Sequence, residues 1–355
     1  MSGMSLPPIV LFVGSGGVGK TTLAAATAVA SARSGTPTLV MTFDPSHRLR
    51  QALGIAWEPD GTEVEVPLDS AAGRLDASLL DARATFDRLV DRYAPDAATR
   101  QRILQNRFYR QLAGALAGIL EYMAVERLFE ARATGRHARI VLDTPPTRQA
   151  LDFLAAPRRV VDFLDSGAVR FALRPWFDAD GRFAPAARLP LVGRLLERRL
   201  AAAIDDLVGL DLVADMGEFF AAFDPLFAGF RDRALAVERL LTSSETGFVL
   251  VAGPGEERIA ETLFFARHLR AAGCRLLGVL VNRVHPWPLP EEAPELLAFL
   301  SAGDRRGVDE LRARLDGACP LWSLPLIDEE VGGLDSLADL SGRLAWLWEV
   351  RRDPA

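Results

Sequence analysis

The residues with the clearest chemistry lie in one glycine-rich segment near the start of the chain. It reads Gly14-Ser-Gly-Gly-Val-Gly-Lys-Thr-Thr22 and fits the phosphate-loop pattern G-x-x-x-x-G-K-[ST]. Of the 41 lysine and arginine residues, Lys20 is the only lysine. A compact ammonium fits among crowded phosphate oxygens better than a planar guanidinium does. We therefore predict that this segment binds a nucleotide.

Each position of the loop has an expected role. Its backbone N–H groups face the β-phosphate, and the N-terminus of the following helix adds its positive end. Lys20 is expected to bridge the β- and γ-phosphates, and the Thr21 hydroxyl is expected to bind Mg²⁺. The predicted nucleotide-binding residues of the loop are Gly14, Ser15, Gly16, Gly17, Val18, Gly19, Lys20, Thr21 and Thr22.

The same glycines also match a second pattern. Gly14, Gly16 and Gly19 fit the G-x-G-x-x-G fingerprint of dinucleotide-binding proteins. Asp44 ends the next predicted strand, where such proteins carry a ribose-binding acid. The adjacent lysine and threonine favour the phosphate loop, because dinucleotide sites do not need that pair.

A second acidic residue, Asp143, ends the apolar run that begins at Arg139. A carboxylate in this place can hold Mg²⁺ through water beside a phosphate loop, although an aspartate at a strand end is also a common helix cap. The stiff segment Thr144-Pro-Pro-Thr147 follows and favours the metal role, because such a loop can sense a γ-phosphate.

These residues need a scaffold, and the sequence predicts one in which apolar runs alternate with helical patterns. Strands are predicted at 9–13, 38–43, 140–143, 248–252, 276–282 and 321–324, and helices at 20–34, 256–272 and 334–350. Continuous apolar runs are typical of parallel strands covered on both faces. We therefore expect a doubly wound, mostly parallel α/β sheet of the P-loop NTPase type, formed by residues 1–75, 134–150 and 246–355.

Two stretches interrupt the alternation. Residues 76–133 and 147–241 are nearly all helical in pattern, with too little strand signal to extend the sheet. We expect residues 76–133 and 151–245 to form an inserted helical subdomain, and residues 291–317 to form a polar surface excursion. In the second stretch, five phenylalanines lie approximately on one helical face. Such a face is expected either to line a groove for a hydrophobic helical client or to pack in the core. That face consists of Phe219, Phe220, Phe223, Phe227 and Phe230.

Composition argues against several classes of protein. The net charge of −6 argues against a nucleic-acid partner. Cys274 and Cys319 lie too far apart for a C-x-x-C zinc site, and two cysteines do not make a disulfide framework. A signal-peptide pattern and an apolar run of about 18 residues are both missing from the sequence. We therefore expect a cytoplasmic protein without stable membrane insertion.

The motifs, in their order, resemble those of the ArsA-type ATPases, which include the arsenite-pump motor and targeting factors for tail-anchored membrane proteins. The glycine-rich segment is similar to that family's deviant Walker A loop. Segments 43–49 (Phe-Asp-Pro-Ser-His-Arg-Leu) and 143–147 (Asp-Thr-Pro-Pro-Thr) resemble its two switches. Asn282-Arg283 resembles its adenine-contacting element, and Pro325-Leu326 looks like its base-covering loop.

The resemblance implies a dimeric ATPase that uses ATP and Mg²⁺. Asp44 would then position or activate the attacking water, and Thr21, Asp143 and Asp44 would surround the metal. Adenine contacts are implied for Asn282, Arg283 and Pro325. The predicted helical subdomain falls where the family carries its client-binding subdomain, which implies a hydrophobic helical client.

One departure from the family pattern bears on partners. The family's loop usually has a second lysine that reaches across the dimer, and Ser15 occupies that position here. Paired actinobacterial relatives include a subunit without this lysine, and the chain resembles that subunit. The expected arrangement is a homodimer or a heterodimer with a lysine-bearing paralogue. Arg48 or Arg148 are candidates for the missing charge, or they form ordinary surface ion pairs.

Three other functions remain to be distinguished from an active ATPase. A regulatory subunit would bind ATP but hydrolyse little alone, in keeping with Ser15. An arsenite-pump motor needs clustered thiols for a soft metalloid, and the two cysteines lie in unrelated segments. A chromosome-partitioning ATPase is disfavoured by the acidic balance of the chain.

Overall fold

The computed structural model describes residues 6–43, 48–55, 62–68, 73–110, 119–145, 147–166, 210–327 and 332–349. The chain divides into two compact units. The first consists of Met1–Asp81, Arg127–Leu154 and Arg239–Ala355, and the second of Ala82–Glu126 and Ala155–Glu238. The expected insert limits, 76–133 and 151–245, stay a prediction.

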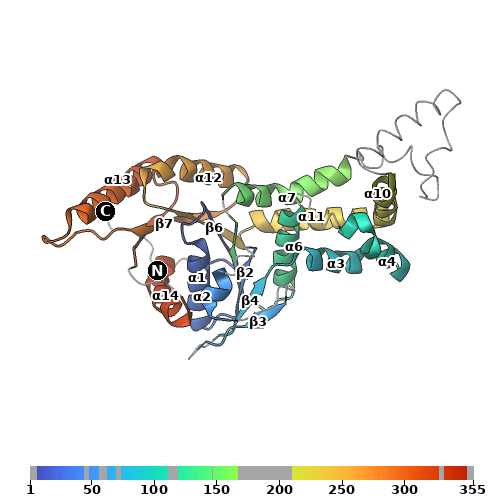
Figure 1. The fold of residues 1–355 in the computed structure, drawn as a ribbon, viewed down its shortest axis with the longest axis horizontal. Helices are drawn as coiled ribbons and strands as arrows, with labels where there is room; N and C mark the ends of the chain where they lie inside the picture. Colours follow the sequence, from blue (N-terminus) through green and yellow to red (C-terminus); the bar gives the residue numbers. More distant parts are fainter. Residues whose placement is uncertain are drawn as a thin grey trace, which may run out of the picture. The chain divides into compact units, whose positions relative to one another are not determined.

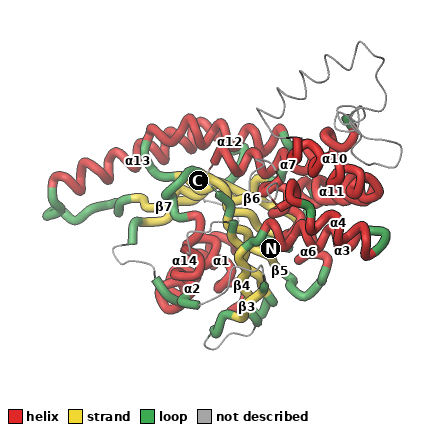
Figure 2. The backbone as a smooth tube through the Cα atoms, turned by 45° about the vertical axis from the view of Figure 1, so that its right-hand side comes forward, coloured by secondary structure: helices red, strands yellow, loops and turns green. Residues whose placement is uncertain are grey.

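The first unit is built on a sheet whose described strands have the order β3-β4-β2-β5-β1-β6-β7-β8 (Figures 1 and 2). Neighbouring strands are parallel, except for the antiparallel pair β3 and β4 at one edge. The strands are β1 (Ile9–Gly14), β2 (Thr38–Thr42), β3 (Glu63–Glu65), β4 (Leu75–Leu79), β5 (Arg139–Asp143), β6 (Thr246–Ala252), β7 (Leu276–Val284) and β8 (Leu321–Pro325). The predicted α/β fold is confirmed, and all six predicted strands occur.

Helices cover both faces of this sheet (Figure 1). One face carries α1 (Lys20–Arg33), α2 (Arg48–Leu53) and α14 (Leu334–Glu349). The other carries the short 3-10 helix η3 (Glu256–Arg258), α12 (Ile259–Ala271) and α13 (Glu295–Leu315). The strand β1 is buried along its whole length, as expected for a central strand covered on both sides.

The strand order determines where a ligand can bind. The chain leaves β1 for β2 on one side, while β6 is the neighbour of β1 on the other side. Strand β5 returns to lie directly between β2 and β1. In doubly wound sheets the crevice at such a reversal, beyond the carboxyl ends of the strands, is the usual ligand site. The glycine-rich segment follows β1 at this point.

The expectation of too little strand signal after residue 75 was wrong, because β4 pairs in parallel with β2. Asp76 interrupts the apolar pattern of this strand, yet it is buried. Its carboxylate is paired with Arg74 and with His137, which lies 61 residues away. Local sequence does not reveal such a distant partner, so the strand resembled part of a helical region.

The predicted polar excursion at 291–317 contains the long helix α13. Its buried residues recur every three or four positions near its end, at Val308, Leu311 and Leu315. Its first turns expose Leu296 and Phe299 instead. The helix was missed because its apolar face covers the protein only over its second half.

The second unit contains α3 (Ala82–Tyr93), α4 (Ala97–Gln105), α10 (Leu210–Phe223) and the 3-10 helix η2 (Asp224–Leu226). Three more helices, α6 (Ile119–Ala133), α7 (Thr147–Asp165) and α11 (Phe227–Thr242), contain residues of both units. Asp224 and Pro225 form the first turn of η2, which leads directly into α11.

The phenylalanine face of the second unit is mostly core. Phe219, Phe223 and Phe230 are buried. Phe223 stacks on Phe86 with ring centroids 5.9 Å apart and meets Phe230 edge-on at 4.7 Å. These aromatic pairs are typical of a packed interior. Of the two interpretations of this face, core packing describes these three side chains.

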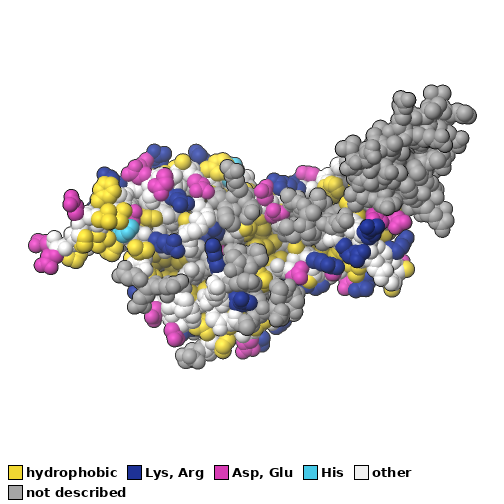
Figure 3. Space-filling model, viewed as in Figure 1, with side chains coloured by type: hydrophobic (Ala, Val, Ile, Leu, Met, Phe, Trp, Pro, Cys, Tyr) yellow, Lys and Arg dark blue, Asp and Glu magenta, His cyan; other side chains and the backbone are white. Residues whose placement is uncertain are grey.

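Acidic and basic side chains are interspersed over the described part of the face drawn in Figure 3. Within the described ranges, the chain has no helix with the length and apolar character needed to cross a membrane.

Candidate nucleotide-binding site

The glycine-rich segment leaves β1 through a backbone that only glycine tolerates. Gly14 has φ 145°, and a β-carbon there would lie 2.0 Å from the backbone oxygen of Val251. Gly19 has φ 92° and precedes the first residue of α1. A β-carbon on Gly19 would lie 2.5 Å from Nδ2 of Asn282. The two glycines therefore let the loop pass close to β6 and β7 before it turns into α1.

Lys20 is the first residue of α1, and its side chain lies inside the loop. Only 7% of the residue is exposed, and its ammonium donates a hydrogen bond of 2.7 Å to the backbone oxygen of Ser15. The loop thus holds a buried cation at the N-terminus of a 14-residue helix. A buried cation and a helix N-terminus both attract an anion.

An oxygen-rich pair lies next to this cation. The Thr21 hydroxyl donates to Oδ2 of Asp143 at 2.7 Å, and the Thr42 hydroxyl donates to the same oxygen at 3.0 Å. The strands determine this arrangement, because Asp143 ends β5 opposite Phe12 of β1 and Thr42 of β2. Hydroxyl and carboxylate oxygens are the ligands that Mg²⁺ prefers. This pair therefore fits a magnesium ion beside a phosphate.

The next strand on the other side supports the loop. Nδ2 of Asn282 donates to the backbone oxygen of Val18 at 2.8 Å, and Nη1 of Arg283 donates to that of Gly17 at 2.9 Å. Arg283 has φ 64°, a left-handed conformation in which a residue other than glycine is uncommon. These residues, predicted to contact adenine, thus hold two carbonyls of the loop from β7.

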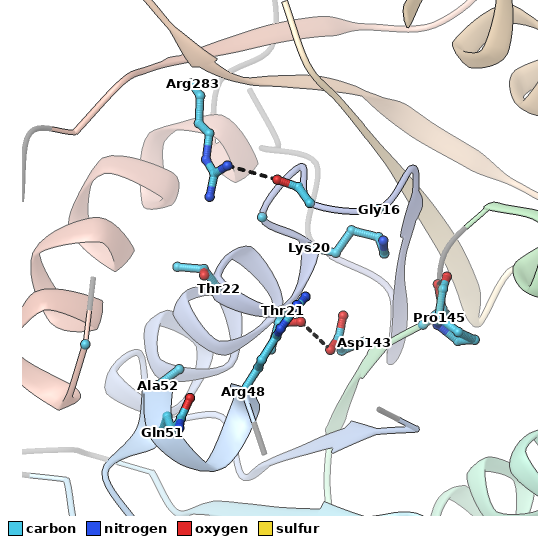
Figure 4. A pocket seen from close by; sticks show the side chains of 14 residues that line it. Gly16, Lys20, Thr21, Thr22, Arg48, Gln51, Ala52, Asp143, Pro145 and Arg283 are labelled. Carbon is cyan, nitrogen blue, oxygen red and sulfur yellow. Dashed lines mark hydrogen bonds between the residues drawn. The ribbon is translucent and has the colours of Figure 1, made fainter. Parts of the chain in front are cut away.

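A cavity of about 430 Å³ opens over the loop (Figure 4). Its volume lies within the range of small-molecule sites. The predicted residues that line it are Gly16, Gly17, Gly19, Lys20, Thr21, Thr22, Asp143 and Arg283. The other residues that line it are Arg48, Gln51, Ala52, Thr144, Pro145 and Gly332. The sequence pointed to Arg48 as a possible source of charge and to the segment 144–147 as a γ-phosphate sensor, but it gave no sign of Gln51 or Ala52.

The remaining predicted residues lie elsewhere or are not described. Gly14, Ser15, Val18 and Asn282 belong to the loop or its support and do not line the cavity. Pro325 ends β8 and pairs with Val284 of β7. Asp44, the predicted catalytic and metal-binding residue, lies outside the described residues, as does Arg148 as a side chain.

The two cysteines do not belong to the candidate nucleotide site. Burial raises the pKa of Cys274 to about 11 and also raises the pKa of Cys319. Metalloids bind the thiolate form. The Cys274 and Cys319 thiols are free and do not line the cavity.

Comparison with known proteins identifies the family. The model of the anion-transporting ATPase family matches residues 8–176. Protein Rv2184c of Mycobacterium tuberculosis is 33% identical over 357 residues, which cover 93% of this chain and 81% of that protein. A putative arsenical pump-driving ATPase 1 of Aquifex aeolicus is 24% identical over 94% of this chain and 77% of its own length. ATPase GET3B of Arabidopsis thaliana is 27% identical with the same coverage.

The family match includes the phosphate loop, Thr21, Asp143 and the strands β1, β2 and β5. The chain belongs to the ArsA-type family of nucleotide-dependent ATPases.

Proposed function

We propose that this protein is a Mg²⁺-dependent ATPase that couples the state of its bound nucleotide to the helical unit. The observation that carries the proposal is the arrangement of Lys20, Thr21 and Asp143 around one cavity. A buried ammonium, a hydroxyl and a carboxylate, placed at a helix N-terminus, form the donor set that a magnesium nucleotide needs.

Each group has a distinct task in this proposal. The backbone N–H groups of the loop hold the β-phosphate, and Lys20 neutralises charge on the β- and γ-phosphates. Thr21 and Asp143 hold the Mg²⁺, which would neutralise charge that develops on the phosphate oxygens. Asn282 and Arg283 keep the loop carbonyls turned away from the phosphates, because both side chains donate to those carbonyls. Asp44 is proposed to orient the attacking water.

Calorimetric titration with MgATP tests the site. We expect Lys20→Ala to abolish measurable binding, and Lys20→Arg to restore little, because the wider guanidinium does not fit the space that the loop leaves for the ammonium. Arg33→Ala, in the last turn of the same helix, is the control and should bind as the wild type does. Wild-type affinity in Lys20→Ala would reject the assignment of the loop.

We further propose that the protein works as a dimer, either with itself or with a paralogue that supplies a lysine. The family membership supports this arrangement, and the uncharged Ser15 in the loop is the reason to include a paralogue. The mass in solution should double with MgATP relative to MgADP if two copies suffice. A monomer in every nucleotide state would exclude the homodimer.

A regulatory subunit remains the second candidate, because Ser15 leaves the loop with Lys20 as its only charged side chain. Phosphate release distinguishes the two. An ATPase active by itself releases phosphate in the absence of other proteins, whereas a regulatory subunit binds MgATP with the same Lys20 dependence and releases little.

A further inference from the structure

The described lining of the cavity offers few positive charges for the nucleotide proposed here. A nucleoside triphosphate has several negative charges, and Asp143 adds another. The cationic side chains among the described lining residues are Lys20, Arg48 and Arg283. The ammonium of Lys20 donates to the oxygen of Ser15, and Arg283 donates to that of Gly17. Both of these cations are thus held against the loop itself.

Arg48 differs from the other two cations. It is the first residue of α2 and is exposed, and no hydrogen bond or ion pair joins its guanidinium to another described residue. Leu49 and Leu53 of the same helix are buried in the hydrophobic core, so α2 packs against the sheet unit beside the cavity. Among the described lining cations, Arg48 is therefore the one whose guanidinium has no hydrogen bond or ion pair to another described residue.

The direction of the side chain indicates what it can reach. Figure 4 shows Arg48 extending from α2 toward Thr21 and Asp143, whereas Arg283 approaches the loop from β7. Thr21 and Asp143 mark the end of the cavity at which the outermost phosphate and its metal ion belong. A guanidinium presents two parallel N–H donors, which match two oxygens of one phosphate.

We propose that Arg48 binds the terminal phosphate of the nucleotide from within the same chain. This inference rests on the proposed nucleotide site and adds a residue that discriminates a triphosphate from a diphosphate.

The test compares the affinities for MgATP and MgADP by calorimetry in the full chain. We expect Arg48→Gln to weaken MgATP binding about tenfold or more and MgADP binding less than about twofold, since only the triphosphate has the group that Arg48 contacts. Arg48→Lys should give an intermediate value, because it keeps the charge but not the two-pronged geometry. Arg50→Gln is the matched control, since Arg50 lies in the same helix and does not line the cavity.

An unchanged MgATP affinity in Arg48→Gln would overturn the inference. An equal loss for MgATP and MgADP would also overturn it, because Arg48 would then act on the inner phosphates or on the fold. Lys20→Ala, measured in parallel, distinguishes a failure of the nucleotide site from a failure of the role of Arg48. If Lys20→Ala still binds MgATP, the nucleotide site itself is wrong; if it does not bind while Arg48→Gln binds normally, only the role of Arg48 fails.

Discussion

Two buried carboxylates of the first unit depend on residues that are distant in the sequence. Asp143, 2% exposed, accepts hydrogen bonds from Thr21 and Thr42. Asp76 lies 2.8 Å from Nε2 of His137 and also accepts from Arg74. A buried carboxylate is tolerated only where charged or polar partners replace the water that it has lost.

The cluster around Asp76 offers the ligand types of a metal site. Single atoms of Glu63, Asp76 and His137 lie within 4.8 Å of one another. Guanidinium groups already provide positive charge to both carboxylates, so we assign the cluster a structural role. These groups belong to Arg74, Arg127 and Arg136.

The first prediction concerns Asp76. Burial alone would raise its pKa, but hydrogen bonds and charges from Arg74 and His137 outweigh that effect and lower it. A lowered pKa in the folded state means that ionised Asp76 stabilises the protein above the pKa of the unfolded chain, about 3.9. This contribution is lost as the pH falls through the lower pKa of the folded state.

We therefore expect Asp76→Asn to lower the free energy of unfolding by about 1.5–3 kcal/mol at pH 7. The difference from the wild type should shrink as the pH falls below about 4. Urea unfolding of both proteins at pH 7, 5 and 3.5 measures it. A difference that is the same at all three values would show that the carboxylate charge has no part in stability.

At the level of elements, the site depends on how closely the loop passes the strands beside β1. Gly14 and Gly17 both have positive φ, but their surroundings differ. A β-carbon at Gly14 would collide with the backbone of Val251, whereas one at Gly17 would meet nothing within 4 Å. The cost of a positive φ can thus be measured at Gly17 alone, whereas Gly14 combines it with a steric conflict.

The second prediction uses this matched pair of glycines. Gly17→Ala should cost about 1–2 kcal/mol of stability, the usual penalty for a left-handed residue with a β-carbon. Gly14→Ala should cost several kcal/mol, or prevent folding, because β1 and β6 must also separate. Thermal unfolding of the two variants gives the comparison. Equal losses of stability in the two variants would mean that the close approach of β1 to β6 does not contribute to the cost of Gly14→Ala.

At the level of the whole molecule, the helix α7 connects the candidate site to the helical unit along the chain. It begins two residues after Pro145, which lines the cavity, and continues into the second unit. A change in the contacts of the γ-phosphate can shift the helical unit only if the two nucleotide states contact the protein differently. The segment after Asp143 joins the candidate site to the second unit through few residues, so a change in its contacts can be transmitted to α7.

The third prediction concerns this coupling. We expect hydrogen exchange over residues 210–242 to differ between MgATP and MgADP, and a hydrophobic helical peptide to bind the state that exchanges faster. Phe163, 49% exposed, is the better probe of such binding, because Phe223 is 6% exposed and serves the core. Phe163→Glu should weaken peptide binding without loss of stability, whereas Phe223→Ala should destabilise the unit by about 3–5 kcal/mol.

Identical exchange in both nucleotide states, together with the absence of peptide binding, would contradict the coupling. Urea unfolding of Phe163→Glu provides the control for stability in this experiment.

The sequence by itself determined the parts of this protein that follow from local pattern. Continuous apolar runs predicted six of the eight described strands to within two residues at each end, because a buried parallel strand has a simple composition. The spacing of Gly14, Gly19, Lys20 and Thr21 predicted the phosphate loop, because that chemistry requires these residue types within one short segment. The order of the motifs indicated the family, which the comparisons confirm.

Only the tertiary structure decided which distant residues meet. It placed Asp76 in a strand through its pairing with His137, and buried Phe219, Phe223 and Phe230 in a core rather than along an open groove. It brought Asn282 and Arg283 to the loop carbonyls, more than 260 residues away in the chain. These outcomes depend on contacts between remote segments, and the free energy of such contacts is not encoded in the pattern of any one segment.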